Sequence, residues 1–283
     1  MELSSLPVVS APTEIRFALL GGTHMNDAMF PLAAWEGQCR VMTPEGESPP
    51  FLLGNYEGVP FVYVHFHGQD CWLETWLGLR AIGVKDVLTG ASAGGINRLF
   101  STGDWVVPDD AIDLNVDRPV GFPVKYLESP RHAYPRLNPP MDALSRQILL
   151  EEARRVVRAE PDMEAVNIHG RGVHVQTRGS RFETPAEVNM LRSFGADLVS
   201  MNVGTEIVYA RQLGMHCACL NLISNPAEGL GEWTWQELKE VYIRSNPLGA
   251  KIILATLKRL SAVSPEHPRT LDDQRAHLGF GAD

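Results

Sequence analysis

Four short segments of this chain place glycine or polar residues directly after apolar runs. Thr23 follows a glycine pair after the first run, and His65 and His67 close the second. Ser92 begins a glycine-rich stretch after the third run, and Asn225 follows the fourth. Ligands of open α/β sheets bind beyond the carboxyl ends of the strands. If the apolar runs are strands of one sheet, these residues gather at a single site.

The first and third segments have the composition of anion-binding turns. Glycine lets the backbone approach a ligand without a Cβ in the way, and consecutive amide N–H groups can surround an anion. Gly22 and Thr23 offer such groups together with a hydroxyl, and residues 91–97 (ASAGGIN) offer a second glycine pair. A simple turn at the end of a strand is the alternative interpretation for both segments.

The histidines of the second segment are candidate donors to an anion or to a sugar hydroxyl. His65 and His67 lie two residues apart, so on an extended chain their side chains point to the same face. A purely structural role is the alternative for either one. No third ligand follows at a recognisable spacing, so the sequence predicts no metal site.

Residues suited to a planar heterocycle occur in two places. Phe182 and Glu183 follow Arg181 just before a predicted helix, where a ring could stack on a base and a carboxylate could accept its N–H groups. The alternative is that the acid only complements the helix dipole. Asn225 can both donate and accept hydrogen bonds, which suits the edge of a base. Its alternative role is to form a turn before Pro226.

The elements that must position these residues alternate along the chain. Apolar runs predict strands in residues 15–22, 59–68, 85–97, 173–177, 196–202 and 215–224. Helical spacing and capping residues predict helices in residues 71–83, 141–160, 184–195, 206–214 and 234–246, and Pro247 must kink or divide the last. This alternation predicts a single α/β domain with a mixed central β-sheet flanked by helices.

Composition limits the classes of function. The chain has 283 residues and a net charge of -9, which opposes binding to nucleic acid. No apolar stretch approaches the roughly 20 residues that cross a membrane, and no secretory signal pattern opens the chain. The cysteines lack metal-type pairs, which favours a reducing, cytoplasmic setting. We expect a disordered N-terminal arm in 1–14, the domain in 15–262 and a frayed C-terminal tail in 263–283.

Residues 177–225 (TRGSRFETPAEVNM to LNLISN) resemble the signature region of the trimeric purine nucleoside phosphorylases and methylthioadenosine phosphorylases. Residues 90–113 are similar to the glycine-rich segment and following strand of that family, and GGTHM at 21–25 is similar to its first phosphate loop. The resemblance covers most of the chain from Ile15 to about Leu260, and the ordered series of motifs is far more specific than any one of them.

The resemblance implies roles for the base and ribose positions. Phe182 matches the aromatic residue beside the base, and Glu183 matches the carboxylate that accepts hydrogen bonds from a 6-oxopurine. Met201 matches the residue under the ribose. Asn225 matches the side chain that hydrogen-bonds the departing purine, and the adenine-selective branch of the family has Asp there. The other base-site positions that it implies are Ala91, Ser92 and Ala93.

The resemblance also implies a mechanism in which phosphate is the co-substrate and no cofactor is needed. The purine leaves through an oxocarbenium-like state, and phosphate traps the sugar as its 1-phosphate. Asn225 and His67 are the expected catalytic residues. The expected phosphate contacts are Gly22, Thr23, His65, His67, Ser92 and Asn202.

Several residues depart from the family pattern around phosphate. The family's arginine near HFHG is missing, Asn202 replaces a serine or threonine, and Gly204 with Thr205 replaces valine and proline. His65 or His67 could substitute for the arginine, but neither offers a permanent bidentate charge. A phosphate-independent purine nucleosidase is therefore an alternative, and a nucleoside-binding protein without activity is another.

The resemblance implies a homotrimer in which a neighbouring subunit completes each site. The segment 121–140 (GFPVKYLESPRHAYPRLNPP) is the expected donor, through Phe122, Tyr126 or His132. Trp233 and Trp235 precede the last predicted helix, at the sugar end of the family's site. They could admit an unusual 5'-modified nucleoside, or they could simply anchor the helix.

Overall fold

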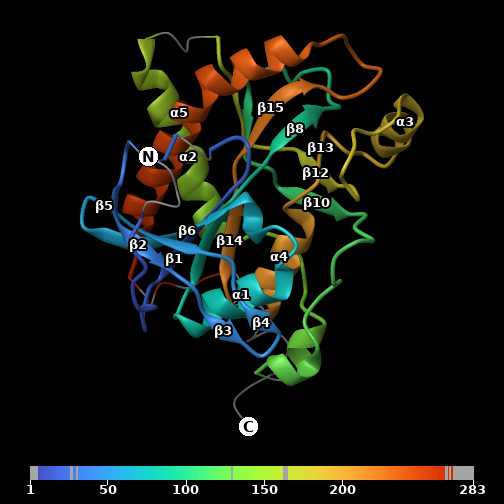
Figure 1. Ribbon diagram of the computed structural model, residues 1–283. Helices are drawn as coiled ribbons and strands as arrows, with labels where there is room; N and C mark the ends of the chain where they lie inside the picture. The colour runs from blue at the N-terminus through green and yellow to red at the C-terminus, as the bar shows by residue number, and fades with distance from the viewer. Residues whose placement is uncertain are drawn as a thin grey trace.

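The computed structural model describes residues 6–25, 28–29, 31–128, 130–161, 165–264, 267 and 269. Figure 1 shows the arrangement of its helices and strands. The helices are α1 (Trp72–Ala81), α2 (Ala143–Ala159), α3 (Pro185–Ser193), α4 (Gly204–Gln212) and α5 (Trp235–Ser261), with short 3-10 turns η2 (Phe66–Gly68), η3 (Val124–Tyr126) and η4 (Pro130–Ala133). The strands are β1 (Phe17–Gly21), β2 (Ala34–Cys39), β3 (Met42–Thr43), β4 (Gly46–Glu47), β5 (Phe51–Tyr56), β6 (Val59–His65), β7 (Asp86–Thr89), β8 (Ser92–Gly95), β9 (Trp105–Val106), β10 (Asp110–Asp113), β11 (Ile168–His169), β12 (Val173–Gln176), β13 (Leu198–Ser200), β14 (His216–Cys219) and β15 (Asn221–Pro226).

The strands form two mixed sheets and one short hairpin. The first sheet has the order β14-β7-β1-β6-β5-β2, and its β14, β7, β1 and β6 are parallel. The second has the order β10-β12-β13-β8-β15-β9-β11, in which β8 is parallel to β15 and antiparallel to β13. The predicted mixed α/β class is confirmed. The strands are, however, divided between two sheets, and the chain crosses from one sheet to the other.

Two neighbouring strands of the first sheet lead directly into two neighbouring strands of the second. Gly90 and Ala91 join β7 to β8, and Leu220 alone joins β14 to β15. Backbone pairing continues through the crossing, because the Leu220 amide donates to Thr89 and the Leu222 amide donates to Ala91. A Cβ on Gly90 would overlap the Leu220 carbonyl oxygen, so this approach requires glycine. The ends of β1, β6 and β7 consequently face the start of the second sheet.

The helix boundaries follow local sequence signals. Thr184 caps α3 by accepting from the Glu187 amide, and the Glu187 carboxylate accepts from the Thr184 amide; this capping box, with Pro185 in the first turn, begins the helix predicted at 184–195. Of the two effects predicted for Pro247, division of the last helix does not occur, since α5 continues to Ser261. Ile243, whose carbonyl loses its partner, is 67% exposed, so water can replace the bond.

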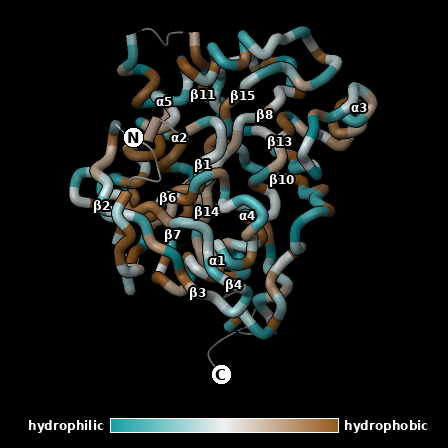
Figure 2. Tube along the Cα trace, viewed as in Figure 1, coloured by the Kyte–Doolittle hydropathy of each residue, from teal (hydrophilic) through white to brown (hydrophobic). Residues whose placement is uncertain are grey.

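Hydrophobic residues concentrate along the first sheet and the helices that cover it. Figure 2 shows hydrophobic segments along β6, β7 and α2 and hydrophilic segments in the outer loops. Leu149 and Ala153 of α2 and Leu254 and Leu257 of α5 belong to one buried cluster with the β1 residue Leu19. In the described part of the chain, no helix combines the length and apolar character needed to cross a membrane.

The terminal segments are more ordered than expected where the structure describes them. The Val9 amide donates to the Gln38 carbonyl of β2, the Gln38 amide donates to Pro7, and Leu6 is buried. The expectation of a disordered arm is therefore wrong for residues 6–9, which pair with a sheet edge that would otherwise be open. In the predicted tail, the Arg269 side chain is buried, so frayed structure does not extend to that residue. The remaining tail positions beyond residue 269 lie outside the described residues.

Candidate active site

A cavity of about 460 Å³ opens at the junction of the two sheets. Its lining residues come from the loop after β1, from β8, β13 and β15, from the segment before α3 and from the first turns of α5. Among the positions predicted from sequence, the cavity brings together Thr23, Ser92, Phe182, Glu183, Met201 and Asn225. Residues up to 219 positions apart in the sequence, such as Thr23 and Tyr242, thus share one site.

Asn225 is held in place at an irregular point of β15. The pairing register with β8 shifts between Ile223 and Asn225, and the Asn225 side chain is buried. Its Oδ1 accepts from the Ser224 hydroxyl at 2.8 Å, and its Nδ2 donates to the Pro226 carbonyl at 2.9 Å. These bonds use one of the two hydrogens on Nδ2, so the second can be offered to a ligand in the cavity.

An aromatic group and a carboxylate border the cavity on the α3 side. The Thr177 hydroxyl donates to Glu183 Oε1 at 2.6 Å and so orients the carboxylate. The Phe182 ring is 44% exposed and lies 5.1 Å from the Trp233 ring and 5.9 Å from the Trp235 ring, between centroids. Trp233 donates in turn to the Glu228 carboxylate. The two tryptophans therefore support the ring predicted to stack on the base, and Trp235 also lines the cavity.

Helix α5 supplies residues that the sequence analysis missed. Tyr242 donates to the Ser92 hydroxyl at 3.2 Å, and Asn246 donates to the Thr23 carbonyl at 2.8 Å. Leu238 and Tyr242 line the cavity beside Trp235. Their spacing of three and four residues places all three on one helix face, and this was the signal that could have found them.

A buried carboxylate and imidazole lie next to the first glycine pair. His67 Nδ1 and Glu206 Oε1 are 2.6 Å apart, and the Thr89 hydroxyl donates to Glu206 Oε2 at 2.7 Å. Burial alone would raise the pKa of Glu206, but His67 and Thr89 lower it overall, so the carboxylate is ionised. His67 Nε2 lies 2.7 Å from the point where a Cβ on Gly22 would stand. The imidazole thus faces the backbone of the predicted phosphate loop.

The expectation that His65 and His67 share one face is wrong. The chain leaves the extended conformation after His65, because Phe66 and His67 both have positive φ, at 44° and 56°. The left-handed turn directs His67 toward Gly22, while His65 lines a separate hollow with Gln38, Pro49, Pro50, Leu52, Gly68 and Gln69. His65 is therefore not placed to contact phosphate in the cavity.

Three further predicted phosphate or base contacts lie outside the cavity lining. Asn202 Oδ1 accepts from Arg118 Nη2 at 2.7 Å, and that guanidinium covers the Trp72 ring. Asn202 is thus engaged by the arginine and does not line the cavity. The stretch expected as a glycine loop at 91–97 is largely strand β8, in which alternate side chains face opposite sides. Ser92 lines the cavity as a result, whereas Ala91 and Ala93 are buried elsewhere.

Most of the residues expected to reach a neighbouring subunit are packed within their own chain. Phe122 is buried against Tyr209, with ring centroids 5.1 Å apart, and Tyr126 is buried with its hydroxyl on Glu45. Both side chains are therefore packed inside their own subunit, which does not favour their contact with a neighbour's site. His132 is partly exposed and stays a candidate.

Comparison with known families matches this chain to the phosphorylase superfamily over residues 17–258. The chain belongs to this family. It is 30% identical over 256 residues to the 6-oxopurine nucleoside phosphorylase of Pyrococcus furiosus, covering 86% of this chain and 92% of the relative. It is 36% identical over 228 residues to the probable S-methyl-5'-thioinosine phosphorylase of Xylella fastidiosa, covering 77% and 87%.

A solved member of the superfamily has the same fold. Methylthioadenosine phosphorylase from Schistosoma mansoni, in complex with adenine, matches with a TM-score of 0.77 over 94% of this chain and 98% of that chain, at 19% identity. The nucleoside phosphorylase fold inferred from the sequence is therefore confirmed, and the chain is a pentosyltransferase-type enzyme.

Proposed function

We propose that this enzyme cleaves the N-glycosidic bond of a 6-oxopurine nucleoside with phosphate, giving the free base and a sugar 1-phosphate. The observation that carries the proposal is that Glu183 and Asn225 line one cavity beside the exposed Phe182 ring. An ionised carboxylate accepts the N1–H of a 6-oxopurine, whereas the unprotonated N1 of adenine would face it as a second acceptor. Relatives whose names specify a 6-oxopurine or a thioinosine substrate support this choice.

In the proposed reaction the purine departs with developing negative charge. The Asn225 Nδ2 hydrogen not used by Pro226 donates to the leaving base, and Ser224 fixes the amide that carries it. Phe182 and Glu183 hold the base in register, and Met201 lies under the ribose. Phosphate bound near Gly22, Thr23 and His67 stabilises the sugar cation and then captures its C1.

A 5'-thio-modified nucleoside is a second candidate substrate of the same class. Leu238, Trp235 and Met201 give part of the cavity an apolar lining. An apolar 5'-substituent that contacts these residues would gain roughly 25 cal/mol for each Å² of apolar surface removed from water. The Xylella fastidiosa relative supports this alternative by its name.

Base release from inosine, guanosine, adenosine and S-methyl-5'-thioinosine, each with and without phosphate, tests the proposed function. We expect phosphate-dependent release of hypoxanthine or guanine together with a sugar 1-phosphate, both identified by chromatography, and little release from adenosine. Release that does not require phosphate would instead establish a nucleosidase. The absence of release from all four nucleosides at any phosphate concentration would contradict the proposal.

Replacing Glu183 with glutamine tests how the base is recognised. Glutamine keeps the shape but loses the charge, and a hydrogen bond to a charged group contributes about 1.5 to 3 kcal/mol. We expect kcat/KM for the 6-oxopurine substrate to fall about 10- to 150-fold, the equivalent of that energy. Glu232→Gln is the control, because Glu232 is exposed and does not line the cavity. Equal kcat/KM values for the two variants would rule out this role of Glu183.

We further propose a cytoplasmic enzyme that assembles as a homotrimer. Cys39, Cys71, Cys217 and Cys219 are all unpaired, which supports a reducing location. Burial raises the pKa of the Cys219 thiol to about 12, so it behaves as a small hydrophobic side chain within β14. The trimer is supported by the family resemblance and by the partial exposure of His132 in the segment expected to reach a neighbour.

A further inference from the structure

His24 is a buried histidine in the proposed phosphate loop, and the fold does not explain the role of its side chain. Its side chain is fully buried, and neither ring nitrogen has a hydrogen-bond partner in the described part of the chain. A buried polar group without a partner is costly, so such a group calls for an explanation. Both ring nitrogens of His24 can therefore bind a ligand, directly or through a water molecule.

The position of the His24 ring indicates where that ligand lies. Its Nδ1 is 3.4 Å from the place of a Cβ on Gly22, and its Nε2 is 3.1 Å from the place of a Cβ on Gly90. The ring therefore extends from the end of β1 to the end of β7, two adjacent parallel strands. Ligands of such sheets bind at these carboxyl ends, so His24 borders the expected binding place.

A second unsatisfied imidazole converges on the same glycine. His67 Nε2 lies 2.7 Å from the Cβ position of Gly22, and it too is buried without a partner in the described residues. Because the Glu206 carboxylate occupies Nδ1 of His67, that nitrogen carries the hydrogen, and a protonated ring then donates through Nε2. Gly22 and Thr23 belong to the loop that is proposed to bind phosphate through its backbone N–H groups.

The chemistry of this group favours an oxyanion. Backbone N–H groups and protonated imidazoles are donors, which suit phosphate or sulfate oxygens. The described residues include no group of three or more His, Cys, Asp or Glu that could hold a metal ion, so a cation is not indicated. The charged neighbour that acts on His24 is His67.

We propose that His24 acts with His67 as the cationic binding group for phosphate, and that His24 takes up a proton when the anion binds. The proposal rests on the proposed function only in naming phosphate as the physiological anion. Without a ligand, burial and then the nearby His67 lower the pKa of His24 to about 3, so it is neutral at pH 7. A bound dianion favours the protonated ring, which then supplies positive charge beside the Gly22 backbone.

The groups around His24 determine how its proton uptake is measured. His67 faces it from η2, and the ionised Glu206 of α4 lies behind His67. Thr89 of β7 is neutral, as is Asn246 of α5, which bonds the Thr23 carbonyl. His67 and Glu206 are present in both proteins, so the difference between the wild type and a His24 variant isolates the contribution of His24.

Sulfate is the suitable probe because it stays a dianion from pH 5.5 to 8, whereas phosphate itself titrates. We expect the inhibition constant of sulfate against phosphate to rise about tenfold per pH unit between the pKa of His24 in the free enzyme and its higher pKa in the complex, since binding takes up one proton. In His24→Gln this slope disappears. The KM for phosphate in that variant rises about 10- to 100-fold, while the KM for nucleoside changes less than about threefold.

His267→Gln, which changes an exposed histidine, is the control and keeps the wild-type slope. Calorimetry of sulfate binding to the wild type in buffers of different ionisation enthalpy measures proton uptake directly, so the proposal stays testable even if the His24 variant does not fold. Sulfate binding without proton uptake, or a His24→Gln enzyme with wild-type phosphate KM, would overturn the proposal. Proton-coupled sulfate binding by a wild type that releases no base would leave this site standing and contradict only the proposed function.

Discussion

Asn225→Ala lowers kcat for phosphorolysis about 100- to 1,000-fold, with a much smaller change in the KM for phosphate. This range is typical for removing one donor aimed at charge that develops in a transition state. Asn225 fits that description, because it is buried at the cavity and Ser224 and Pro226 fix its amide. The donor strengthens as the base acquires negative charge, so its loss affects the chemical step more than ground-state binding.

Steady-state kinetics with the preferred 6-oxopurine nucleoside measure the effect of Asn225→Ala. Asn189→Ala is the matched control, because Asn189 is an exposed residue of α3 outside the cavity lining. Thermal unfolding of both variants separates a chemical effect from a loss of structure. A kcat within threefold of the control would remove Asn225 from the proposed mechanism.

The helices and the central strands could be predicted because their signals are local. The capping box of α3 needs only Thr184 and Glu187, three residues apart, and it is formed as expected. The strands β1 and β6 are largely apolar runs, as buried parallel strands are, and all four residues of β7 are buried. These elements place the ends of three strands together, which is why the sequence alone is enough to assign Thr23 and Ser92 to one site.

The secondary-structure predictions were wrong where hydrogen bonding between distant segments overrides the local conformational preference of the residues. Residues 92–95 (SAGG) have poor strand propensity, yet they form β8 because β13 and β15 hydrogen-bond to it on both sides. The run 215–224 was expected as one strand, but Leu220 divides it between two sheets. The left-handed turn at Phe66 and His67 could not be predicted from sequence, because neither residue is the glycine that usually indicates a positive φ. Surrounding contacts hold the turn instead.

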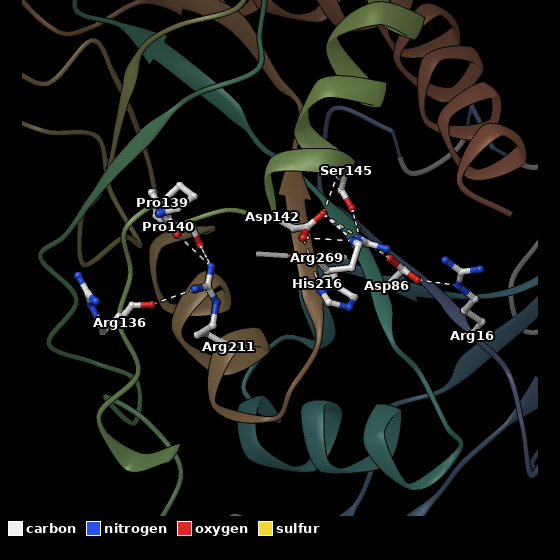
Figure 3. A network of polar contacts seen from close by, with 10 residues as sticks. All are labelled: Arg16, Asp86, Arg136, Pro139, Pro140, Asp142, Ser145, Arg211, His216 and Arg269. Atoms are coloured by element: carbon white, nitrogen blue, oxygen red, sulfur yellow. Dashed lines mark hydrogen bonds and ion pairs between the residues drawn. The ribbon is translucent and has the colours of Figure 1, made fainter. Parts of the chain in front are cut away.

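The buried ion-pair network around Arg269 could not be predicted from local sequence either, because its charged residues come from four distant segments. Figure 3 shows Arg269 between Asp142 and Asp86, with Arg16 on the far side of Asp86. Arg269 Nη2 lies 2.8 Å from an oxygen of each carboxylate, and Arg16 Nε lies 2.7 Å from Asp86. Asp142 also caps α2 through the Ser145 amide. A polar tail thus contributes a residue that connects the end of the chain to β7 and α2.

Arg269→Met is expected to lower the free energy of unfolding by about 3 to 5 kcal/mol, because removing one partner of a buried ion pair leaves an uncompensated charge. Asp86 keeps Arg16 at 2.7 Å, whereas the contacts of Asp142 that remain include the longer one with His216, whose Nδ1 is 3.5 Å away, and the Ser145 amide. Most of the cost therefore falls on Asp142. Denaturant unfolding at pH 7 measures it, with Arg259→Met as the control. Arg259 is 45% exposed and pairs with Glu151 and Glu152, so its loss should cost about 0 to 1 kcal/mol.

The pH dependence of the same variant separates charge from packing. Burial alone would raise the pKa of Asp142, but hydrogen bonds from His216 and Arg269 hold it well below its ordinary value. A carboxyl with a lowered folded pKa contributes stability that is fully present above its unfolded pKa, about 3.9, and is lost as the pH falls through the folded value. The difference between wild type and Arg269→Met should therefore be constant from about pH 6 to 7 and should shrink below about pH 4. A difference that stays the same at pH 3 would mean that Arg269 stabilises the fold through the packing of its aliphatic stem, and the ion-pair account would then be wrong.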